Sequence, residues 1–370
     1  MTTRNVAPYG AWESPITAGL IVSKTMSLGA ITLDGSQVYW LEARPTEGGR
    51  QVLVCLGPDD QITDLTPAPF NVRTRVHEYG GGSYLVHEGV VYFANFADQR
   101  LYRLAGDEAQ PLTPAVDLRY ADAMMDARRG RLIAVREDHT QAGPQAVNTL
   151  ISLDVNGDEA GGRVLVEGAD FYSSPRLSPD GRRLAWLAWH HPNMPWDGTE
   201  LWVADVTGDG SLANATLVAG GPAESIFQPE WSPGGRLAFV SDRTDWWNLY
   251  HWRDGQIEPL CPLDAEFGQP QWVFGQSTYA YVTDNQIVCT YNQNGISYLA
   301  LLEVSRGQLQ PIELPYTQIG QVRVADGRAV FAAASATIEP CIVELDLNSY
   351  QTKVLRRASQ LNIAPGYISV

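Results

Sequence analysis

The stretch SPDGRRLAW, residues 178–186, recurs as SPGGRLAF at residues 232–239. In both copies Pro and Gly favour a tight turn, because proline fixes one backbone angle and glycine permits angles closed to other residues. The apolar residues after each turn follow the two-residue period of a half-buried strand. The repeated pattern therefore predicts, twice, a turn followed by a β-strand.

Weaker copies of the same pattern occur along the rest of the chain and bring the total to seven. They lie at residues 33–40, 88–93, 129–135, 274–281 and 326–331. The average spacing is about 48 residues, which is typical of propeller blades and too long for most helical repeats. The chain therefore carries seven repeats of blade size.

A second strand follows each of these units, and no window longer than about ten residues has a convincing helical period. We predict an all-β chain folded as a seven-bladed β-propeller with four-stranded antiparallel blades. We expect the propeller at residues 31–360, an amino-terminal segment at 1–30 and the start of a linker at 361–370. The predicted second strands are 51–56, 100–104, 149–153, 200–205, 248–252, 298–304 and 341–345.

The composition limits the class of partner. With 42 acidic and 26 basic residues the formal net charge is −16, so phosphate groups and anionic lipids would repel the chain. We expect neither nucleic acid nor a membrane as a partner.

The four cysteines lie far apart and signal neither a disulfide ladder nor a zinc site. Residues 1–26 lack the apolar core of a signal peptide, so we expect a cytoplasmic protein with no metal and no other cofactor.

One segment that exceeds the minimal repeat is RTRVHEYGGG, residues 73–82. Its three glycines allow backbone conformations closed to other residues and let the chain approach a ligand or partner closely. His77, Glu78 and Tyr79 precede them and are candidates for a substrate cavity. The alternative is a bulged start of a strand, in which these side chains bond only to the backbone.

Two further segments carry aromatic and histidine side chains. Residues 189–198 contain His190, His191 and Trp196. Adjacent histidines of a strand point to opposite faces, so a docking loop is favoured over a metal site. Trp246 and Trp247 suggest either packing between blades or a domain interface.

Glu137 and Asp138, within RED at residues 136–138, are second candidates for the cavity, with a solvated surface loop as the alternative. The chain holds no G-x-S-x-G nucleophile elbow, no phosphate-binding glycine loop and no H-E-x-x-H motif. We therefore predict no catalytic residue in this chain.

Four motifs together resemble the amino-terminal propeller of prolyl oligopeptidase-family serine peptidases, most closely the acylaminoacyl-peptidase and dipeptidyl-aminopeptidase-like branch. They are APYGAWESPI at 7–16, HEYGGG at 77–82, REDH at 136–139, and the run from WSP at 231–233 through SDR at 241–243 to NLY at 248–250. The resemblance covers nearly the whole chain. It implies that the propeller is followed by an α/β-hydrolase domain that carries the catalytic triad.

The resemblance also implies a role: the propeller caps the hydrolase active site, admits only short peptides and contributes residues to the cavity. His77, Glu78 and Tyr79 would then face the cavity, where a carboxylate can hold a peptide's amino terminus, and Tyr9 and Trp12 would anchor the hydrolase domain. The chain stops near the expected crossover into that domain. Two alternatives stay open, a stand-alone TolB-like propeller that binds other proteins, and a propeller hydrolase with a metal in its channel.

Overall fold

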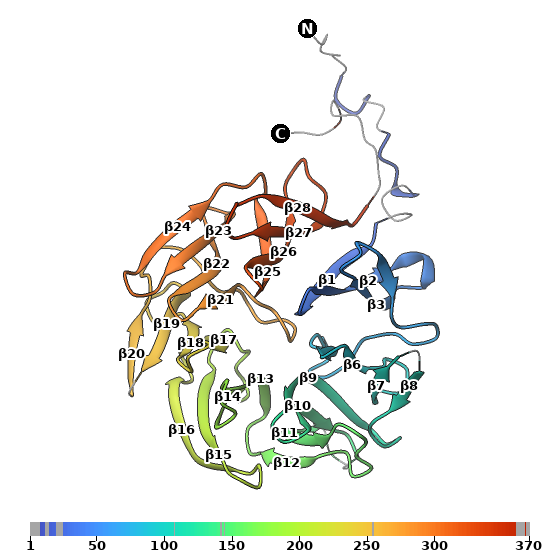
Figure 1. Cartoon of the computed structure of the whole chain (residues 1–370), viewed down its shortest axis with the longest axis vertical. Coiled ribbons are helices and arrows are strands. Elements are labelled where there is room, and N and C mark those ends of the chain that lie inside the picture. The colour runs from blue at the N-terminus through green and yellow to red at the C-terminus, as the bar shows by residue number, and fades with distance from the viewer. Residues whose placement is uncertain are drawn as a thin grey trace.

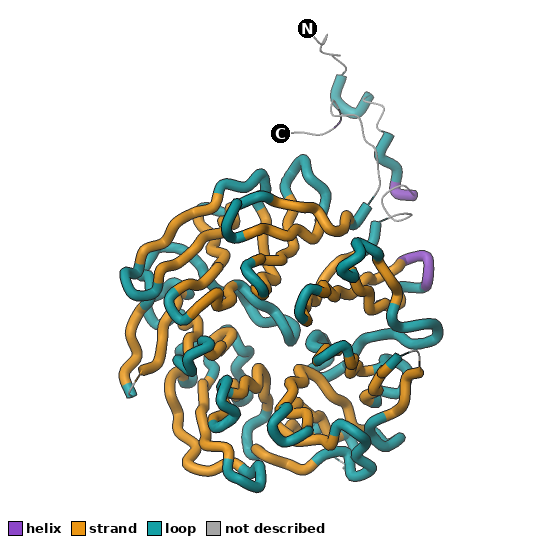
Figure 2. The backbone as a smooth tube through the Cα atoms, in the orientation of Figure 1, coloured by secondary structure: helices purple, strands orange, loops and turns teal. Residues whose placement is uncertain are grey.

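The computed structural model describes residues 8–11, 15–19, 25–106, 108–140, 143, 145–253, 255–359 and 367. Within these residues, strands β1 to β28 form seven sheets of four antiparallel strands. The sheets are arranged as blades around a common centre, and loops and turns connect their strands (Figures 1 and 2). The predicted seven-bladed β-propeller is confirmed.

Each blade consists of four strands that are consecutive in the sequence. Blade 1 holds β1 (Ser27–Asp34), β2 (Gln37–Arg44), β3 (Arg50–Leu56) and β4 (Ile62–Asp64), with a short 3-10 helix, η1 (Pro45–Glu47), after β2. Blade 2 holds β5 (Tyr84–His87), β6 (Val90–Ala94), β7 (Leu101–Ala105) and β8 (Glu108–Pro111). Blade 3 holds β9 (Leu118–Asp126), β10 (Arg131–Asp138), β11 (Val147–Asp154) and β12 (Arg163–Val166).

The other four blades follow the same plan. Blade 4 holds β13 (Phe171–Leu177), β14 (Arg183–Trp189), β15 (Glu200–Val206) and β16 (Leu212–Gly220). Blade 5 holds β17 (Ile226–Trp231), β18 (Leu237–Ser241), β19 (Asn248–Arg253) and β20 (Gln256–Pro259). Blade 6 holds β21 (Tyr279–Thr283), β22 (Gln286–Gln293), β23 (Ile296–Glu303) and β24 (Gln308–Ile312). Blade 7 holds β25 (Gln318–Ala325), β26 (Arg328–Ala334), β27 (Cys341–Asp346) and β28 (Thr352–Arg357).

The strand bounds agree closely with the sequence pattern. All seven predicted second strands overlap the third strand of a blade. The first blade begins at Ser27, slightly ahead of the expected boundary at residue 31, and the last strand ends at Arg357. No helix in the described part of the chain is long and apolar enough to cross a membrane.

Within the part of the chain that the structure describes, the hydrophobic core is divided into seven clusters, one between each pair of neighbouring blades. Trp40, for example, is fully buried between blades 1 and 7, where it packs with Val330 and Ile342. Burial of such side chains contributes roughly 1.5–3 kcal/mol each. Because every blade buries both of its faces, each blade depends on both of its neighbours for stability.

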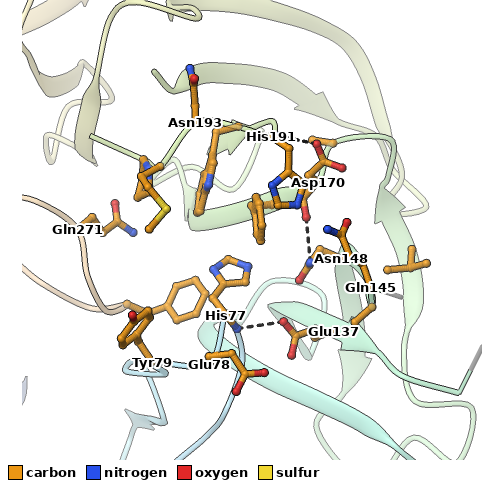
Figure 3. A pocket seen from close by; sticks show the side chains of 18 of the residues that line it. His77, Glu78, Tyr79, Glu137, Gln145, Asn148, Asp170, His191, Asn193 and Gln271 are labelled. Atoms are coloured by element: carbon orange, nitrogen blue, oxygen red, sulfur yellow. Dashed lines mark hydrogen bonds between the residues drawn. The ribbon is translucent and has the colours of Figure 1, made fainter. Parts of the chain in front are cut away.

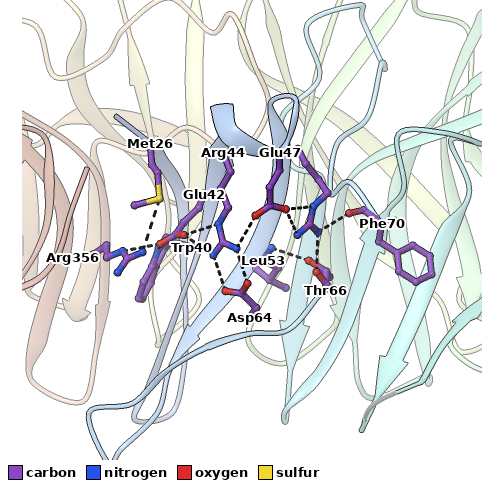
Figure 4. A network of polar contacts seen from close by, with 11 residues as sticks. Met26, Trp40, Glu42, Arg44, Glu47, Leu53, Asp64, Thr66, Phe70 and Arg356 are labelled. Carbon is purple, nitrogen blue, oxygen red and sulfur yellow. Dashed lines mark hydrogen bonds and ion pairs between the residues drawn. The ribbon is translucent and has the colours of Figure 1, made fainter. Parts of the chain in front are cut away.

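The ring closes between blades 1 and 7 without a shared strand. Glu42 of β2 is fully buried and lies 2.7 Å from Arg356 of β28 and 2.7 Å from Arg44. The indole of Trp40 donates to the same carboxylate at 3.2 Å, and Asp64 holds Arg44 from the outer strand (Figure 4). Ion pairs and apolar packing therefore join the two ends of the ring.

Bulges in the inner strands provide further ties between blades. Asp122, Gln228 and Gln321 each have a positive φ where the strand register shifts. Their side chains accept backbone N–H groups of the next blade, from Ser174 at 2.6 Å, Thr278 at 2.7 Å and Ile31 at 3.4 Å, respectively. These bonds satisfy backbone donors that the bulges remove from the sheet ladders.

Candidate functional site

A pocket of about 750 Å³ opens on one face of the ring. In an antiparallel blade, the segment before the first strand and the loop between the second and third strands emerge on the same face. The pocket lies where several such segments meet: those before β5, β13 and β21, and the loops after β10 and β14 (Figure 3). Segments that are distant in sequence therefore form one site.

The His77–Gly82 segment is placed by its glycines. Gly81 forms a parallel bridge with Phe274, and Gly80 accepts a hydrogen bond from Phe274 N at 2.9 Å. A Cβ atom on Gly81 would lie 2.5 Å from the Phe274 carbonyl oxygen, and the φ of Gly81 is 88°. Only glycine fits such a close approach. Because this segment precedes blade 2 and Phe274 precedes blade 6, the pairing spans the ring.

Glu137, near the end of β10, holds this segment in place. Its Oε1 accepts a hydrogen bond from His77 N at 3.0 Å. Its Oε2 lies 2.9 Å from His139 Nε2 and 3.5 Å from Arg119 Nη1. Glu137 is only 6% exposed, so its carboxylate is already used by protein groups.

Glu78 has a different environment. Its side chain is 79% exposed, and its Oε1 lies 3.6 Å from Arg119 Nη1. Arg119 therefore lies between the carboxylates of Glu78 and Glu137, and we call these three residues the Arg119 cluster. Two carboxylates and one guanidinium leave a formal charge of −1. The exposed carboxylate of the cluster is available to a cationic ligand.

His77 forms part of an aromatic wall. Its ring centroid lies 5.0 Å from that of Phe171 and 5.4 Å from that of Trp189, both edge to face, and 4.7 Å from that of Phe274. Burial lowers the pKa of His77 from its ordinary value of 6.5 to about 4, because the charged form loses its hydration. The ring is therefore neutral at pH 7.

Among the described residues, two buried polar atoms at this wall, His77 Nε2 and Asn148 Oδ1, have no hydrogen-bond partner. Their side chains lie next to each other in the pocket (Figure 3). Asn148 Nδ2 donates to the carbonyl oxygen of Asp170 at 2.9 Å. Asp170 in turn accepts a hydrogen bond from His191 N at 2.9 Å, which fixes the start of the loop after β14.

A second aromatic group borders the open side of the pocket. Tyr79 and Trp272 are 59% and 50% exposed, and their ring centroids are 5.5 Å apart. Trp196 lies 4.4 Å from Trp272. Exposed aromatic side chains that touch each other are typical of binding surfaces.

The structure brings most of the predicted cavity residues together. His77, Glu78, Tyr79 and Glu137 all line the pocket. Asp138 does not line it: its side chain accepts from Thr140 N at 2.9 Å, because neighbouring strand residues point to opposite faces. The alternative for Glu137, a solvated surface loop, is wrong, since the residue is buried in β10.

The predicted interface residues are more scattered. His191 and Trp196 line the pocket, and His190 Nδ1 lies 3.6 Å from Asp170 at its edge. Trp247 packs in the core between blades 5 and 6, whereas Trp246 is 38% exposed. Tyr9 is fully exposed, and Trp12 lies outside the described residues.

The wall residues Phe171, Trp189, Phe274, Asn148 and Asp170 are not among the predicted site residues, although Trp189 begins the segment 189–198. Their only local signal is their position at or beside the ends of predicted strands. No group of three or more His, Cys, Asp or Glu side chains in the described ranges could hold a metal ion.

Comparison with known proteins gives close structural relatives. No family model and no curated protein matches the chain. Among solved structures, puromycin hydrolase is 36% identical and superposes with a TM-score of 0.92 over 99% of this chain and 58% of that one. A puromycin-hydrolysing peptidase of Mycobacterium tuberculosis is 35% identical, with a TM-score of 0.90 over 96% of this chain and 57% of that one. The chain thus spans somewhat more than half the length of these relatives.

More distant structures share the fold alone. Prolyl oligopeptidase B from Galerina marginata is 14% identical, with a TM-score of 0.63 over 92% of this chain and 52% of that one. The match again covers about half of the other protein. From the fold, the coverage and the 36% identity to puromycin hydrolase, we conclude that the chain belongs to the prolyl oligopeptidase family of peptidases and corresponds to their amino-terminal β-propeller.

Proposed function

We propose that this chain is the non-catalytic propeller of a serine peptidase, which caps and size-gates the active site of an α/β-hydrolase domain that cleaves short peptides. The observation that carries the proposal is the 36% identity to puromycin hydrolase across 99% of this chain. A relative of that similarity has been solved as a mutant complexed with PGG. The hydrolase domain and the peptide are the partners that we propose for this chain.

The pocket supports this role by its volume and its lining. Binding sites are concave, largely apolar and carry a few polar groups that orient the ligand. The pocket has about 750 Å³ of space, aromatic walls and an exposed carboxylate. A hydrolase domain seated over this face would enclose the pocket, and His191 and Trp196 would lie at the joint cavity. A closed chamber of this kind excludes folded proteins by size.

Within this role, Glu78 binds the free amino terminus of the peptide. A carboxylate and an ammonium group form a charge-assisted hydrogen bond, which is about twice as strong as a neutral one. The formal charge of −1 on the Arg119 cluster matches one ammonium group. Recognition of a free amino terminus favours an aminopeptidase-like member of the acylaminoacyl-peptidase and dipeptidyl-aminopeptidase branch.

The substitution Glu78→Gln in the peptidase that carries this propeller tests the proposal. It removes the charge but keeps the size of the side chain, so KM for short peptides should rise by roughly 10- to 100-fold, the cost of one charged hydrogen bond. Glu88→Gln is the matched control, because Glu88 is also exposed and also has a positive φ but lies in the β5–β6 turn outside the pocket. Unchanged KM and kcat in Glu78→Gln would remove this role.

We also propose a cytoplasmic location. All four cysteines are buried and unpaired, which suits a reducing compartment. Fractionation of the source cells with an antibody to this chain tests the location: the protein should follow a cytoplasmic marker, and recovery with secreted proteins would contradict it.

A further inference from the structure

A second pocket, of about 460 Å³, lies on the opposite face of the ring. In an antiparallel blade, the turn between the first and second strands and the turn between the third and fourth strands share one face. Three such turns line the second pocket: β9–β10 and β11–β12 of blade 3, and β15–β16 of blade 4. The second pocket is therefore separate from the cavity that His77 and Glu78 line.

Arg131 is the buried cation of the second pocket. The residue is 8% exposed, and its Nε donates to Asp126 at 2.9 Å. Its Nη2 is buried and has no hydrogen-bond partner within the described part of the chain. A donor that has left water without a new acceptor costs free energy. A ligand oxygen at this guanidinium would recover part of that cost.

Two neighbours adapt the site to such an oxygen. A Cβ atom on Gly210 would lie 2.6 Å from Arg131 Nη1 and 3.2 Å from its Nη2, so any other residue would crowd the guanidinium. Arg163 adds a second, exposed cation, and its Nη2 donates only to the carbonyl oxygen of Asp209, at 3.4 Å. In the described ranges, no carboxylate lies within 4 Å of the Arg163 guanidinium. Two guanidinium groups are therefore available to an anionic group.

A simple anion does not match the total charge, however. The fully buried Asp126 lies beneath the pocket and pairs with Arg129 and Arg131. Three guanidinium groups and four carboxylates, counting Asp126, leave a formal charge of −1. A multiply charged anion such as phosphate would be repelled, so the ligand must bring a positive charge together with its negative one. The charged residues that line the pocket are Arg129, Arg131, Arg163, Asp154, Asp158 and Asp209.

Two of these aspartates can receive the positive charge. Both oxygens of Asp209 are already bonded within its own turn. Asp154 uses its Oδ1 for Asn156 N at 2.8 Å. Asp158 uses its Oδ1 for Ala160 N at 3.1 Å. Among the residues that the structure describes, neither of the two Oδ2 atoms has a hydrogen-bond partner or a cation within 4 Å.

We propose that the second pocket binds a free α-amino acid. The ligand's carboxylate binds Arg131 and Arg163, and its ammonium group binds Asp158 or Asp154. A guanidinium matches the planar geometry of a carboxylate, and charge-assisted hydrogen bonds are about twice as strong as neutral ones. The inference goes beyond the proposed function and does not depend on it, because the second pocket lies on the other face of the ring.

Equilibrium dialysis of radiolabelled glycine against this chain tests the proposal. Glycine has no side chain and isolates the two charged groups. It should bind with a Kd of about 1 mM, the affinity expected of two charge-assisted hydrogen bonds. Glycinamide lacks the carboxylate and N-acetylglycine lacks the ammonium group, so each should compete at least about tenfold more weakly than unlabelled glycine. Inorganic phosphate should compete more weakly still.

Substitutions on the two faces identify the pocket that is occupied. Arg163→Gln and Asp158→Asn each remove one charge from the second pocket and should weaken glycine binding by about tenfold or more. Arg182→Gln is the matched control, because Arg182 is an exposed arginine in the β13–β14 turn of the same face, outside the pocket. Glu78→Gln alters the cavity on the other face and should leave glycine binding unchanged.

Several results would overturn the amino-acid site. They are the absence of saturable binding at millimolar glycine, equal competition by glycinamide or N-acetylglycine, stronger competition by phosphate, and unchanged binding in Arg163→Gln. Loss of glycine binding in Glu78→Gln would also overturn it, because the ligand would then occupy the other cavity. None of these results bears on the peptidase role, which is measured separately as kcat/KM of the complete peptidase.

Discussion

The backbone amide of His77 donates a 3.0 Å hydrogen bond to Glu137 Oε1, although 60 residues separate the two in the sequence. His77 and Glu78 both have positive φ values, 53° and 65°, which are strained for residues other than glycine. The bond from β10 therefore compensates for local strain. Glu137 is a positioning residue for Glu78, and the two carboxylates have separate tasks.

Replacing Glu137 should reveal its positioning role as a loss of stability. Glu137→Ala removes the acceptor of His77 N and should lower the free energy of unfolding by about 1–3 kcal/mol. Glu137→Gln keeps an oxygen at this position and should recover most of the loss. Urea unfolding measures both. Asp138→Ala, next along the strand but outside the pocket, is the control, and an equal loss in all three variants would contradict the role of Glu137.

Gly81 should be difficult to replace. Gly81→Ala places a Cβ atom 2.5 Å from the Phe274 carbonyl oxygen and should cost about 2–4 kcal/mol, from steric displacement and the positive φ together. Gly89 also has a positive φ, of 74°, but a Cβ atom added there would have no atom within 4 Å. The cost of Gly89→Ala, about 1 kcal/mol, isolates the backbone contribution. Equal midpoints of urea unfolding for the two variants would show that the contact with Phe274 is unimportant.

The buried charges between blades 1 and 7 should control closure of the ring. Arg356→Ala leaves Glu42 fully buried with Arg44 as its remaining cation, and should cost about 2–3 kcal/mol. Arg306→Ala breaks an exposed pair with Glu303 and should change stability by less than about 0.5 kcal/mol. Chemical unfolding compares them. A negligible loss in Arg356→Ala would mean that apolar packing alone closes the ring.

His77 should make the fold sensitive to acid. Its pKa is lowered to about 4 in the folded protein, from an ordinary value of 6.5. Between these two values the unfolded chain binds a proton that the folded chain does not, so stability falls as pH decreases from 6.5 to 4, by up to about 3 kcal/mol. His77→Asn tolerates the positive φ and should remove this part of the pH dependence. Identical pH profiles for the two proteins would contradict it.

The fold was predictable because its signals are local. Turns such as Pro179–Gly181 and the two-residue period after them occur in every blade, and their spacing fixes the blade count. The ties between blades were not predictable. The positive φ of Gln228 and its bond to Thr278 N depend on a neighbouring blade, which no local pattern reports.

The site was predictable only in part, for a similar reason. The three glycines after Tyr79 drew attention to His77 and Glu78, which do line the pocket. Phe171 and Trp189 have the same sequence signature as core residues, because both lie at the ends of apolar strands. Which strand ends face one another is set by closure of the ring. Strand alternation directs the side chains of Glu137 and Asp138 to opposite faces of β10. The two candidates can be distinguished only when it is known that β10 extends to residue 138.

The most direct test of the central claim combines Glu78→Gln with acetylation of the substrate's amino terminus. The peptidase that carries this propeller and its Glu78→Gln variant are each assayed with one short peptide, free or acetylated. Acetylation should lower kcat/KM of the unaltered enzyme by roughly 10- to 100-fold, and it should lower that of Glu78→Gln by less than about threefold, because the bond is already lost. An equal effect of acetylation on both enzymes would show that Glu78 does not bind the amino terminus.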